Sequence, residues 1–321
     1  MASTTVPIQS GETNSLRPLN IFRDLPQVAD LIELCFSATM DEDGQSYLQQ
    51  MRRAGRDTSF LQWANSASSV PLSGIVWEEN GKIIGNVSLV THNFKGRKIT
   101  LIANVATHPD YRRRGIGRAL TERAMAQARQ KGARELWLQV RDDNPTAIKI
   151  YKDLGFVERA RRTTYQTYPN SFRTSTTNEM TVTKTKLQFW PLQRDWLYRT
   201  HPDELSWYWR WDWDRLGPGL QMWVHRLFVE FDIRQWAAVR NGKLMATVSW
   251  LGATRPTELL WAATPPNGEA AALRSALEAA CRELVNQRRL TVEYPAGEMV
   301  EAIQAAGFKP QRTLIWMRAT C

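Results

Sequence analysis

The 321-residue chain has few cysteines, few histidines and no long apolar run. Its three cysteines, Cys35, Cys281 and Cys321, are far apart and odd in number, so they suggest neither a disulfide framework nor a closed four-ligand zinc site. No stretch approaches the roughly 18 consecutive apolar residues of a membrane-spanning helix. The N-terminus is polar and lacks the apolar segment of a signal peptide. These absences predict a cytoplasmic protein with no metal site and no membrane partner.

Length and composition favour two ordinary globular domains. At roughly 150 residues per domain, 321 residues are enough for two cores. With 43% hydrophobic and 23% charged residues, the chain is neither disordered nor fibrous. The net charge is +10, of which residues 1–184 contribute +7 from 25 basic and 18 acidic residues. This excess attracts anionic ligands, which by itself leaves nucleic acid, an anionic membrane surface and a phosphorylated cofactor open.

The first half alternates strand and helix patterns, as in an α/β sheet. Asn80-Gly81 between two strand-like runs is a strong type I′ turn signal and predicts a hairpin over 70–92. An apolar run at 99–107 predicts a buried strand, and an apolar stripe over 115–131 predicts a helix. The other elements expected here are a strand at 16–19, a helix at 24–35 with Asp24 as its N-cap residue, helices at 47–53 and 145–154, a strand at 136–140, and further strands to about 185.

The second half repeats part of this pattern. The segment 242–249 (GKLMATVS) resembles 81–88 (GKIIGNVS), and 306–308 (AGF) resembles 154–156 (LGF). The elements expected between them follow the same order as in the first half: a strand at 258–263, a helix at 269–284 and a strand at 290–294. The sequence therefore predicts a tandem duplication whose copies have diverged.

A basic turn with two glycines connects the strand at 99–107 to the helix that follows it. Backbone N–H groups at the start of a helix have no intrahelical partner, and the helix dipole adds partial positive charge there, so such a turn suits a phosphate group. Gly115 and Gly117 would let a pyrophosphate approach the backbone. Positive charge around them comes from Arg112, Arg113, Arg114 and Arg118. The other interpretation is a strand-to-helix turn with solvated arginines.

A second block at 144–156, NPTAIKIYKDLGF, has the spacing N-x-x-A-x-x-x-Y-x-x-x-G-F. Together with R-x-x-G-x-G at 112–117, it resembles the acyl-CoA-binding core of GCN5-related N-acetyltransferases (GNAT), and the element order is similar over roughly residues 15–185. The resemblance implies an α/β chain of two tandem GNAT folds, each a mixed, mostly antiparallel twisted sheet flanked by helices. The division that follows is a mobile leader at 1–15, a catalytic acetyl-CoA-binding domain at 16–185, and a degenerate, Trp-rich GNAT-like domain at 186–321.

The resemblance also implies roles for individual residues, with acetyl-CoA as the acyl donor. The strand end at 105–107 would bond the pantetheine arm and the acetyl carbonyl between two splayed parallel strands. Tyr151 would protonate the leaving thiolate, and a phenol with a reference pKa of about 10 is able to do so at neutral pH. Its other interpretation is a packed helix residue. The implied cofactor-binding set is Val105, Ala106, Thr107, Arg112, Arg113, Arg114, Gly115, Ile116, Gly117, Arg118, Asn144, Ala147 and Tyr151.

No general base is evident. The run 136–144 resembles the ribosomal-protein alanine N-acetyltransferases, in which a base glutamate precedes the asparagine by five residues, but here that position is Gln139. An amide does not accept the proton of an amine at neutral pH. His92 and His108 are the nearest titratable candidates, and we expect both to be structural. The base is then elsewhere, or the amine loses its proton through water.

The second half lacks the features that carry chemistry in the first. Ile303 stands where the first copy has its tyrosine, and the turn at 264–269 has no arginine. Glu269 reverses the charge at the expected pyrophosphate position, so we expect this half not to bind CoA.

Eleven of the fourteen tryptophans follow residue 185, which makes the second half unusually aromatic. On a strand, residues at period two share one face, so the run Trp207, Trp209, Trp211, Trp213 would form either a ligand wall or core packing. We favour packing. Asp212 and Asp214 would face the other way, toward solvent or a cationic amine.

The leading hypothesis is an enzyme, an N-acetyltransferase that moves an acetyl group from acetyl-CoA to a primary amine of a peptide or small molecule. The alternative is a CoA-binding sensor or scaffold without effective catalysis. Nucleic-acid binding is disfavoured because much of the basic charge surrounds the 112–118 turn and no nucleic-acid-reading motif accompanies it. The acceptor amine and the oligomeric state, for which a homodimer is one option, stay open.

Overall fold

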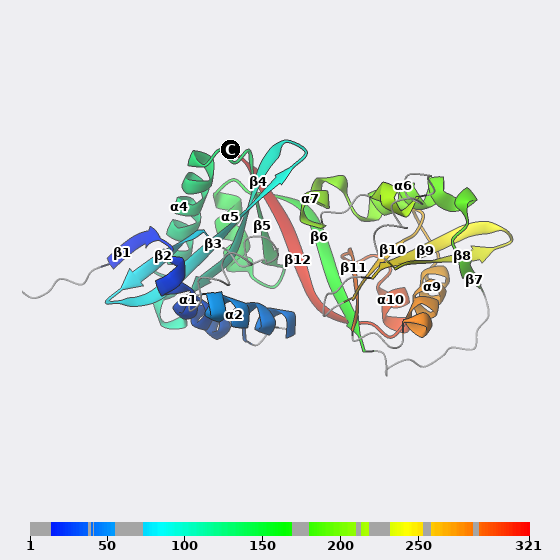
Figure 1. Ribbon diagram of the computed structural model, residues 1–321, viewed down its shortest axis with the longest axis horizontal. Coiled ribbons are helices and arrows are strands. Elements are labelled where there is room, and N and C mark those ends of the chain that lie inside the picture. The colour runs from blue at the N-terminus through cyan, green and yellow to red at the C-terminus, as the bar shows by residue number, and fades with distance from the viewer. Residues whose placement is uncertain are drawn as a thin grey trace, which may run out of the picture. The chain divides into compact units, whose positions relative to one another are not determined.

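The computed structural model describes residues 14–37, 40, 42–54, 73–168, 180–209, 213–217, 232–252, 258–284 and 289–321 (Figure 1). The chain forms two compact units. The first comprises 1–139, 146–157 and 317–321, and the second comprises 140–145 and 158–316. Most of the leader expected at 1–15 lies outside the described residues, although Asn14 and Ser15 already belong to the first strand.

The sheet of the first unit has the strand order β1-β2-β3-β4-β5. All neighbouring strands are antiparallel except β4 and β5, which are parallel. Asn80 and Gly81, between β2 and β3, both have positive φ angles of 51° and 77°, as a type I′ turn requires. The strands are β1 (Asn14–Pro18), β2 (Gly74–Glu79), β3 (Lys82–Phe94), β4 (Arg97–Thr107) and β5 (Glu135–Arg141).

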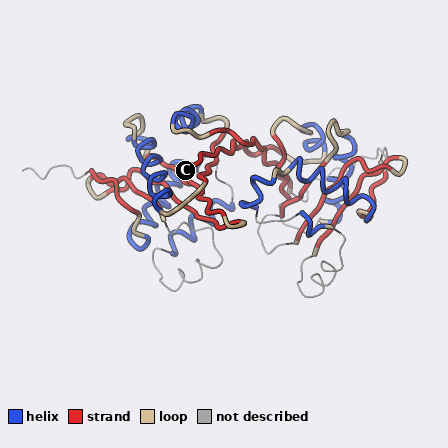
Figure 2. Tube along the Cα trace, turned by 90° about the horizontal axis from the view of Figure 1, so that it is seen from above, coloured by secondary structure: helices blue, strands red, loops and turns tan. Residues whose placement is uncertain are grey.

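Helices cover both faces of this sheet (Figures 1 and 2). One face packs against α1 (Ile21–Phe36) and α2 (Glu42–Ala54), and the other packs against α4 (Ile116–Gln130). A Cβ atom at Gly85 of β3 would lie 2.9 Å from the side chains of Ile116 and Leu120 of α4. Glycine at this position therefore allows α4 to lie close against the sheet. The unit is completed by α5 (Pro145–Asp153), which follows β5.

The first helix begins earlier than its sequence pattern suggests. Asn20, not Asp24, is the N-cap residue, and its side chain accepts a hydrogen bond from the Arg23 amide. Asp24 is buried, and its carboxylate accepts from the Arg17 guanidinium at 2.6 Å. Burial alone would raise the pKa of Asp24, but the hydrogen bonds from Arg17 and the Asn20 amide outweigh it and lower that pKa.

The second unit is a larger, mostly antiparallel sheet with the order β12-β6-β11-β10-β9-β8-β7, in which β10 and β11 are parallel. The strands are β6 (Val157–Thr167), β7 (Thr181–Lys184), β8 (Ile233–Arg240), β9 (Lys243–Leu251), β10 (Glu258–Ala263), β11 (Leu290–Pro295) and β12 (Lys309–Thr320). The helices are α6 (Trp190–Thr200), α7 (Ser206–Trp209), α9 (Ala270–Glu283) and α10 (Val300–Ala305).

The repeat expected from the sequence is present as a repeat of elements. The series β9, β10, α9, β11, α10, β12 follows the same order as β3, β4, α4, β5, α5, β6. Gly155 and Gly307 end the corresponding helices with φ angles of 86° and 87°. In both copies the backbone amide of the next residue, a phenylalanine, donates a hydrogen bond to the carbonyl five residues earlier. Phe156 donates to Tyr151, and Phe308 donates to Ile303.

The compact units do not follow the sequence division after residue 185. Strand β6 precedes that division, yet it pairs with β11 of the second copy along six residues, from Arg162–Pro295 to Thr167–Leu290. That one repeat ends at residue 185 and the other begins at 186 therefore stays a proposal. Within the described residues, no helix has the length and apolar character needed to cross a membrane.

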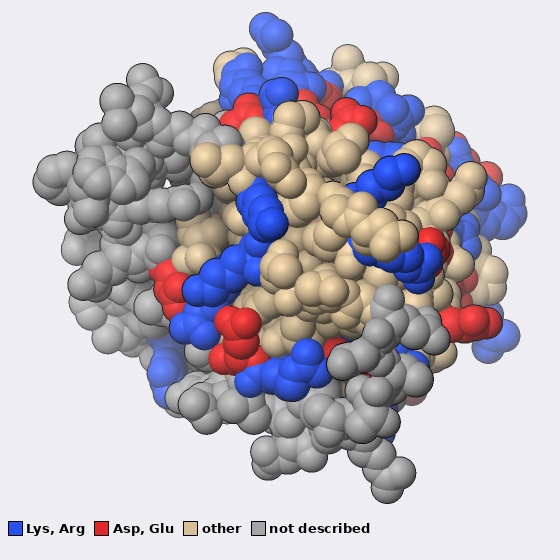
Figure 3. Space-filling view, turned by 90° about the vertical axis from the view of Figure 1, so that its right-hand side faces the viewer, with Lys and Arg blue, Asp and Glu red and all other residues tan. Residues whose placement is uncertain are grey.

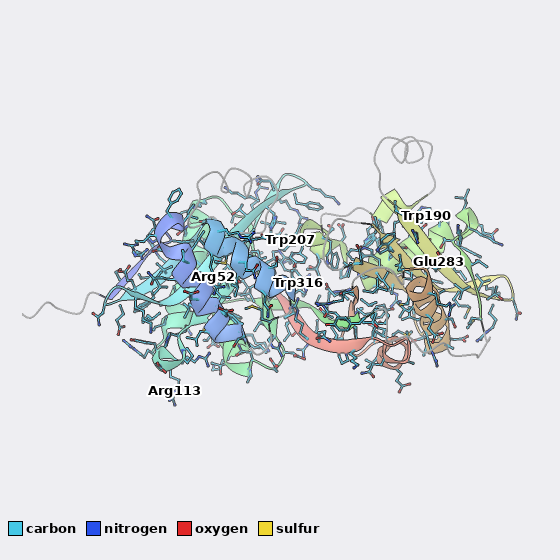
Figure 4. The ribbon with its side chains drawn as sticks, turned by 60° about the horizontal axis from the view of Figure 1, so that its bottom comes forward. Arg52, Arg113, Trp190, Trp207, Glu283 and Trp316 are labelled. Atoms are coloured by element: carbon cyan, nitrogen blue, oxygen red, sulfur yellow. The ribbon has the colours of Figure 1, made fainter. Side chains whose placement is uncertain are left out.

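The tryptophans at period two do not form a strand. Trp207 and Trp209 lie in α7, Trp213 begins a short 3-10 helix, and Trp211 lies outside the described residues. Trp207 and Trp213 are buried, and the Trp207 ring packs edge-on against Trp316 at 6.2 Å between centroids (Figure 4). Packing in the second unit, not alternation along the chain, fixes these rings, so the period-two pattern is misleading here.

Charges on the second unit are largely paired. Asp214 binds Arg194 at 2.7 Å, and Arg234 binds Asp232 at the same distance, whereas Asp212 lies outside the described residues. Figure 3 shows basic and acidic side chains next to one another on one face of this unit. Such exposed pairs contribute little to stability, and on this face they do not form a patch of a single sign.

Candidate active site

The turn between β4 and α4 exposes the backbone at the start of a helix. Gly115 is the N-cap residue, has a φ of 76° and carries no side chain that could cap the helix. The first helical hydrogen bond runs from the Ala119 amide to the Gly115 carbonyl at 3.0 Å. The amides of residues 116–118 precede that bond and have no carbonyl to bond within the helix. This arrangement suits an anion, as the sequence predicts.

The structure gives different reasons for the presence of glycine at positions 115 and 117 of the turn. Gly115 needs its left-handed backbone, which side chains of L-residues rarely adopt. Gly117 has an ordinary helical backbone, and a Cβ there would meet only the Thr107 hydroxyl at 3.7 Å, an ordinary contact distance. Nothing in the described structure requires glycine at position 117. The close approach of a ligand to the backbone would explain why glycine is there.

The four arginines of the turn are not equally available to a ligand. Arg114 binds Glu79 at 2.9 Å, and Arg118 binds Glu122 at 3.0 Å. Arg113 is exposed and, across the part of the chain that is described, has no ion-pair partner. It projects away from the ribbon in Figure 4. Arg112 has no acidic partner among the described residues either, but its Nε lies 3.5 Å from the Thr107 carbonyl. Arg112 and Arg113 can therefore contact an anion without giving up an acidic partner.

Beyond Ile102 the two parallel strands of the first unit part. The register of β4 and β5 runs from Ile99–Glu135 to Ile102–Leu138. Strand β4 continues to Thr107 and β5 to Arg141, with no further pairing between them in the described structure. Val105, Ala106 and Thr107 therefore lie on the parted segment of β4, and Gln139 is the first residue of β5 beyond the last pair.

The Thr107 carbonyl at the end of β4 already has partners within the chain. The Cys35 thiol of α1 donates to it at 3.3 Å, and the Arg112 Nε lies 3.5 Å from it. Burial raises the pKa of Cys35, which keeps the thiol protonated and able to donate. The sequence indicates only that Cys35 lies on the apolar face of a helix, so this contact was not predictable.

Tyr151 is a buried residue of α5. Its ring packs edge-on against Phe156 at 6.1 Å between centroids, and burial raises its pKa to about 12. Ala147 lies half-buried on the same helix. Asn144 precedes the helix, in the segment 140–145 that belongs to the second unit, and its amide bonds to the Arg141 carbonyl. The ligand contacts of these three residues stay predictions.

Neither histidine candidate for the base lies in a catalytic arrangement. His92 pairs with Ile99 near the far end of the β3–β4 hairpin, seven residues along β3 from Gly85, the partner of Thr107, which is roughly 23 Å of strand. His108 caps a 3-10 turn, and its Nδ1 accepts from the Asp110 amide at 3.4 Å. That neither histidine is the general base stays a prediction.

Sequence reasoning missed a cluster of polar side chains beside the parted segment. Asn104, at a bulge in β4, bonds to Tyr47 of α2 and to Ser88 and Asn86 of β3. We call these four residues the bulge cluster. One signal was available, since Asn86 and Ser88 are polar residues inside a strand that otherwise reads as buried.

In the second unit the corresponding strands also part, but side chains of that unit occupy the parting. The pairing of β10 and β11 ends at Leu260–Val292. Beyond it, His201 donates from Nε2 to the Ala262 carbonyl at 3.1 Å, and Arg162 donates to the Glu293 carbonyl at 2.9 Å. Burial, and secondarily the nearby Arg162, lower the pKa of His201 well below its usual value, so it stays neutral.

The turn before α9 also differs from the turn before α4. Glu269 is the N-cap residue of α9 and pairs with Arg240 at 2.8 Å, whereas the corresponding position in the first unit is Gly115. An acidic side chain at a helix N-terminus competes directly with an incoming phosphate.

Comparison with known proteins places this geometry in context. Residues 27–156 match the model of the Acetyltransferase (GNAT) family. A ribosomal protein bS18-alanine N-acetyltransferase of Escherichia coli K12 is 44% identical over 68 residues, which are 21% of this chain and 45% of that protein. The chain thus spans about half the length of this curated relative.

Two solved structures are similar along nearly the whole chain. A tandem GNAT protein from the clavulanic acid biosynthesis pathway has a TM-score of 0.50 and 18% identity, covering 96% of this chain and 98% of that one. A GCN5-related N-acetyltransferase from Sphaerobacter thermophilus has a TM-score of 0.55 and 12% identity, covering 96% and 95%. These likenesses confirm the predicted fold class, two tandem α/β units with mixed, mostly antiparallel sheets.

Proposed function

Because residues 27–156 match the Acetyltransferase (GNAT) family model, we propose that the chain is an N-acetyltransferase that moves an acetyl group from acetyl-CoA to a primary amine. The observation that carries the proposal is the parting of β4 and β5 after the Ile102–Leu138 pair, directly before the exposed start of α4. The segment of β4 that no longer pairs with β5 offers the Val105 backbone to the pantetheine arm, and the turn offers backbone amides and Arg113 to the pyrophosphate.

The chemistry follows from what acyl transfer needs. The neutral amine attacks the thioester carbonyl, a carbon–nitrogen bond forms, the carbon–sulfur bond breaks, and the CoA thiolate takes up a proton. Tyr151 is our candidate donor of that proton, because its raised pKa of about 12 keeps the phenol protonated at every pH at which the protein would act. The amine proton leaves to water, because Gln139 at the parting is an amide and accepts none.

The second unit, in this proposal, binds no CoA. His201 and Arg162 already bond to the carbonyl groups at its strand parting, and Arg199 bonds to the Thr264 carbonyl just beyond β10. A pantetheine arm would have to displace all three side chains. The buried Arg162 also binds the Glu293 carboxylate at 2.7 Å, and separating such a pair leaves a buried charge without its partner.

A CoA-binding sensor is the second candidate, and Gln139 favours it, because it lies at the strand parting and stands where the resemblance of the run 136–144 implies a base glutamate. The test is the release of free thiol from acetyl-CoA with a panel of amines at several pH values. The panel includes peptides with N-terminal alanine, since one relative is named for that substrate, together with lysine peptides, polyamines and aminoglycosides. We expect turnover with one class of amine. Binding of acetyl-CoA without any turnover above the hydrolysis background would support the sensor instead.

A further inference from the structure

The bulge cluster lies within the first unit, next to the parted segment of β4. It consists of Tyr47 of α2, Asn86 and Ser88 of β3, and Asn104 of β4. Asn86 and Ser88 are fully buried, and the neighbouring core on this face of the sheet is apolar. Polar groups are costly in such surroundings unless they are hydrogen-bonded. Their presence here calls for a specific reason.

The bulge itself deprives this part of β4 of regular pairing. The register passes from Ser88–Ala103 to Asn86–Ala106, so that Asn104 and Val105 together stand opposite one residue of β3. Asn104 has a φ of 51°, a left-handed conformation that asparagine tolerates better than most residues. The ladder to β3 resumes at Ala106, so Asn104 and Val105 are the two residues of β4 that it leaves without a regular partner.

Side chains of the cluster supply the fixation that the ladder lacks. The Asn104 amide nitrogen donates to the Tyr47 hydroxyl at 2.7 Å and to the Ser88 hydroxyl at 3.3 Å. The backbone carbonyl of Asn104 accepts a hydrogen bond from the side-chain amide of Asn86 at 3.0 Å. The side chain of Asn104 is therefore held by α2 and β3, and its backbone carbonyl is held by β3.

Stability alone does not explain the cluster. The Asn86 carboxamide oxygen is buried and has no hydrogen-bond partner in the described part of the chain. An apolar residue at position 86 would avoid that cost. What the cluster does achieve is a fixed direction for Val105, the first residue of the segment 105–107 at which β4 no longer pairs with β5.

We propose that Asn104 is a positioning residue, held by Tyr47, Ser88 and Asn86, that aims the Val105 backbone at the acyl group of the donor. This inference rests on the proposed function and deepens it: the cluster gives the site its preference for acetyl-CoA over free CoA. Residues of the 112–118 turn contact the phosphates that both ligands share, so they do not distinguish the two. The acyl carbonyl is the part that only acetyl-CoA has.

The experiment measures the dissociation constants of acetyl-CoA and of CoA by calorimetry on the full chain. Asn104→Gly keeps the left-handed backbone and removes the side chain, and Tyr47→Phe removes one hydroxyl. Asn80→Gly is the matched control, because Asn80 has the same φ of 51° but lies in the β2–β3 turn outside the cluster. We expect the wild type and Asn80→Gly to bind acetyl-CoA about 5-fold more tightly than CoA, the ratio that one net hydrogen bond supplies.

For Asn104→Gly we expect the ratio to fall to about 1 while the CoA affinity stays unchanged, and for Tyr47→Phe we expect an intermediate ratio. An unchanged ratio in Asn104→Gly, or a wild type that does not distinguish the two ligands, overturns the inference. A parallel loss of both affinities in a folded Asn104→Gly variant also overturns it, because it indicates a merely structural role. If the wild type binds neither ligand, the proposed function itself fails, which is a separate result.

Discussion

Tyr151 is the residue on which the proposed chemistry depends most. It is buried against Phe156 and has a pKa raised to about 12 by burial. A group with a raised pKa stays protonated until the pH approaches that value, so this phenol remains a proton donor through neutral and moderately alkaline solution. In that range the acceptor amine titrates, and its neutral, attacking form increases with pH.

Tyr151→Phe removes the hydroxyl and keeps the ring in its packing. We expect turnover to fall roughly 100-fold, the usual contribution of a general acid, with acetyl-CoA affinity unchanged. The wild-type rate should rise with pH as the amine deprotonates, without a decline from loss of the Tyr151 proton over the range measured, because the Tyr151 pKa is raised to about 12. Steady-state kinetics from pH 6 to 10.5 check both, with Tyr165→Phe, a buried tyrosine of the second unit, as the control. A wild-type rate in Tyr151→Phe would mean that another group or water protonates the thiolate.

Single residues also show where sequence reasoning ends. The spacing of the 112–117 turn predicts an anion site, but not that Arg114 and Arg118 are held by acidic partners while Arg113 is exposed. Asp24 has the sequence signature of an N-cap and instead lies buried beside Arg17. Arg118 and Glu122 are only four residues apart on one helix, whereas the partner of Arg114, Glu79, is 35 residues away, and local pattern contains no information about such a contact.

At the scale of elements, α4 and its two glycines carry the binding hypothesis. The structure assigns them different physical constraints, because Gly115 has a positive φ and Gly117 has not. At position 115 the backbone conformation of the protein itself requires glycine. At position 117, in our proposal, the bound ligand requires it. The two substitutions should therefore separate stability from binding.

Gly115→Ala should lower the free energy of unfolding by about 1 kcal/mol, the cost of a left-handed backbone for an L-residue. Gly117→Leu should leave stability unchanged or slightly raised, because leucine is the better helix former, yet it should weaken CoA binding at least 100-fold by filling the space beside the helix amides. Chemical denaturation and calorimetry on both variants check this. Full CoA affinity in Gly117→Leu would exclude the turn as the pyrophosphate site.

The elements of the first unit were predictable because strong local signals bound them. Asn80-Gly81 fixes the β2–β3 hairpin, and the apolar stripe of α4 agrees with its observed range of Ile116–Gln130. The helical turns at 206–209 and 213–216 were not predictable, because the period-two tryptophans suggested one face of a strand, even though packing was the favoured role for their side chains. These turns follow from contacts with Trp261 and Trp316, which lie far along the sequence.

The whole molecule combines two copies of one element order, and only one copy keeps an open strand parting in our account. In the second, His201 and Arg162 bond to the Ala262 and Glu293 carbonyl groups beyond the last pair of β10 and β11. The repeat itself was predictable from short matching segments. The pairing of β6 with β11 was not, because the partner of a strand depends on long-range topology that its own sequence does not encode.

The most direct test of this account is the number of CoA molecules that the full chain binds, measured by calorimetric titration. We predict one site per chain with a micromolar dissociation constant, and no measurable heat for Gly117→Leu under the same conditions. Two equivalent sites would contradict the closed second unit. The absence of binding to a folded wild-type chain would contradict the account as a whole.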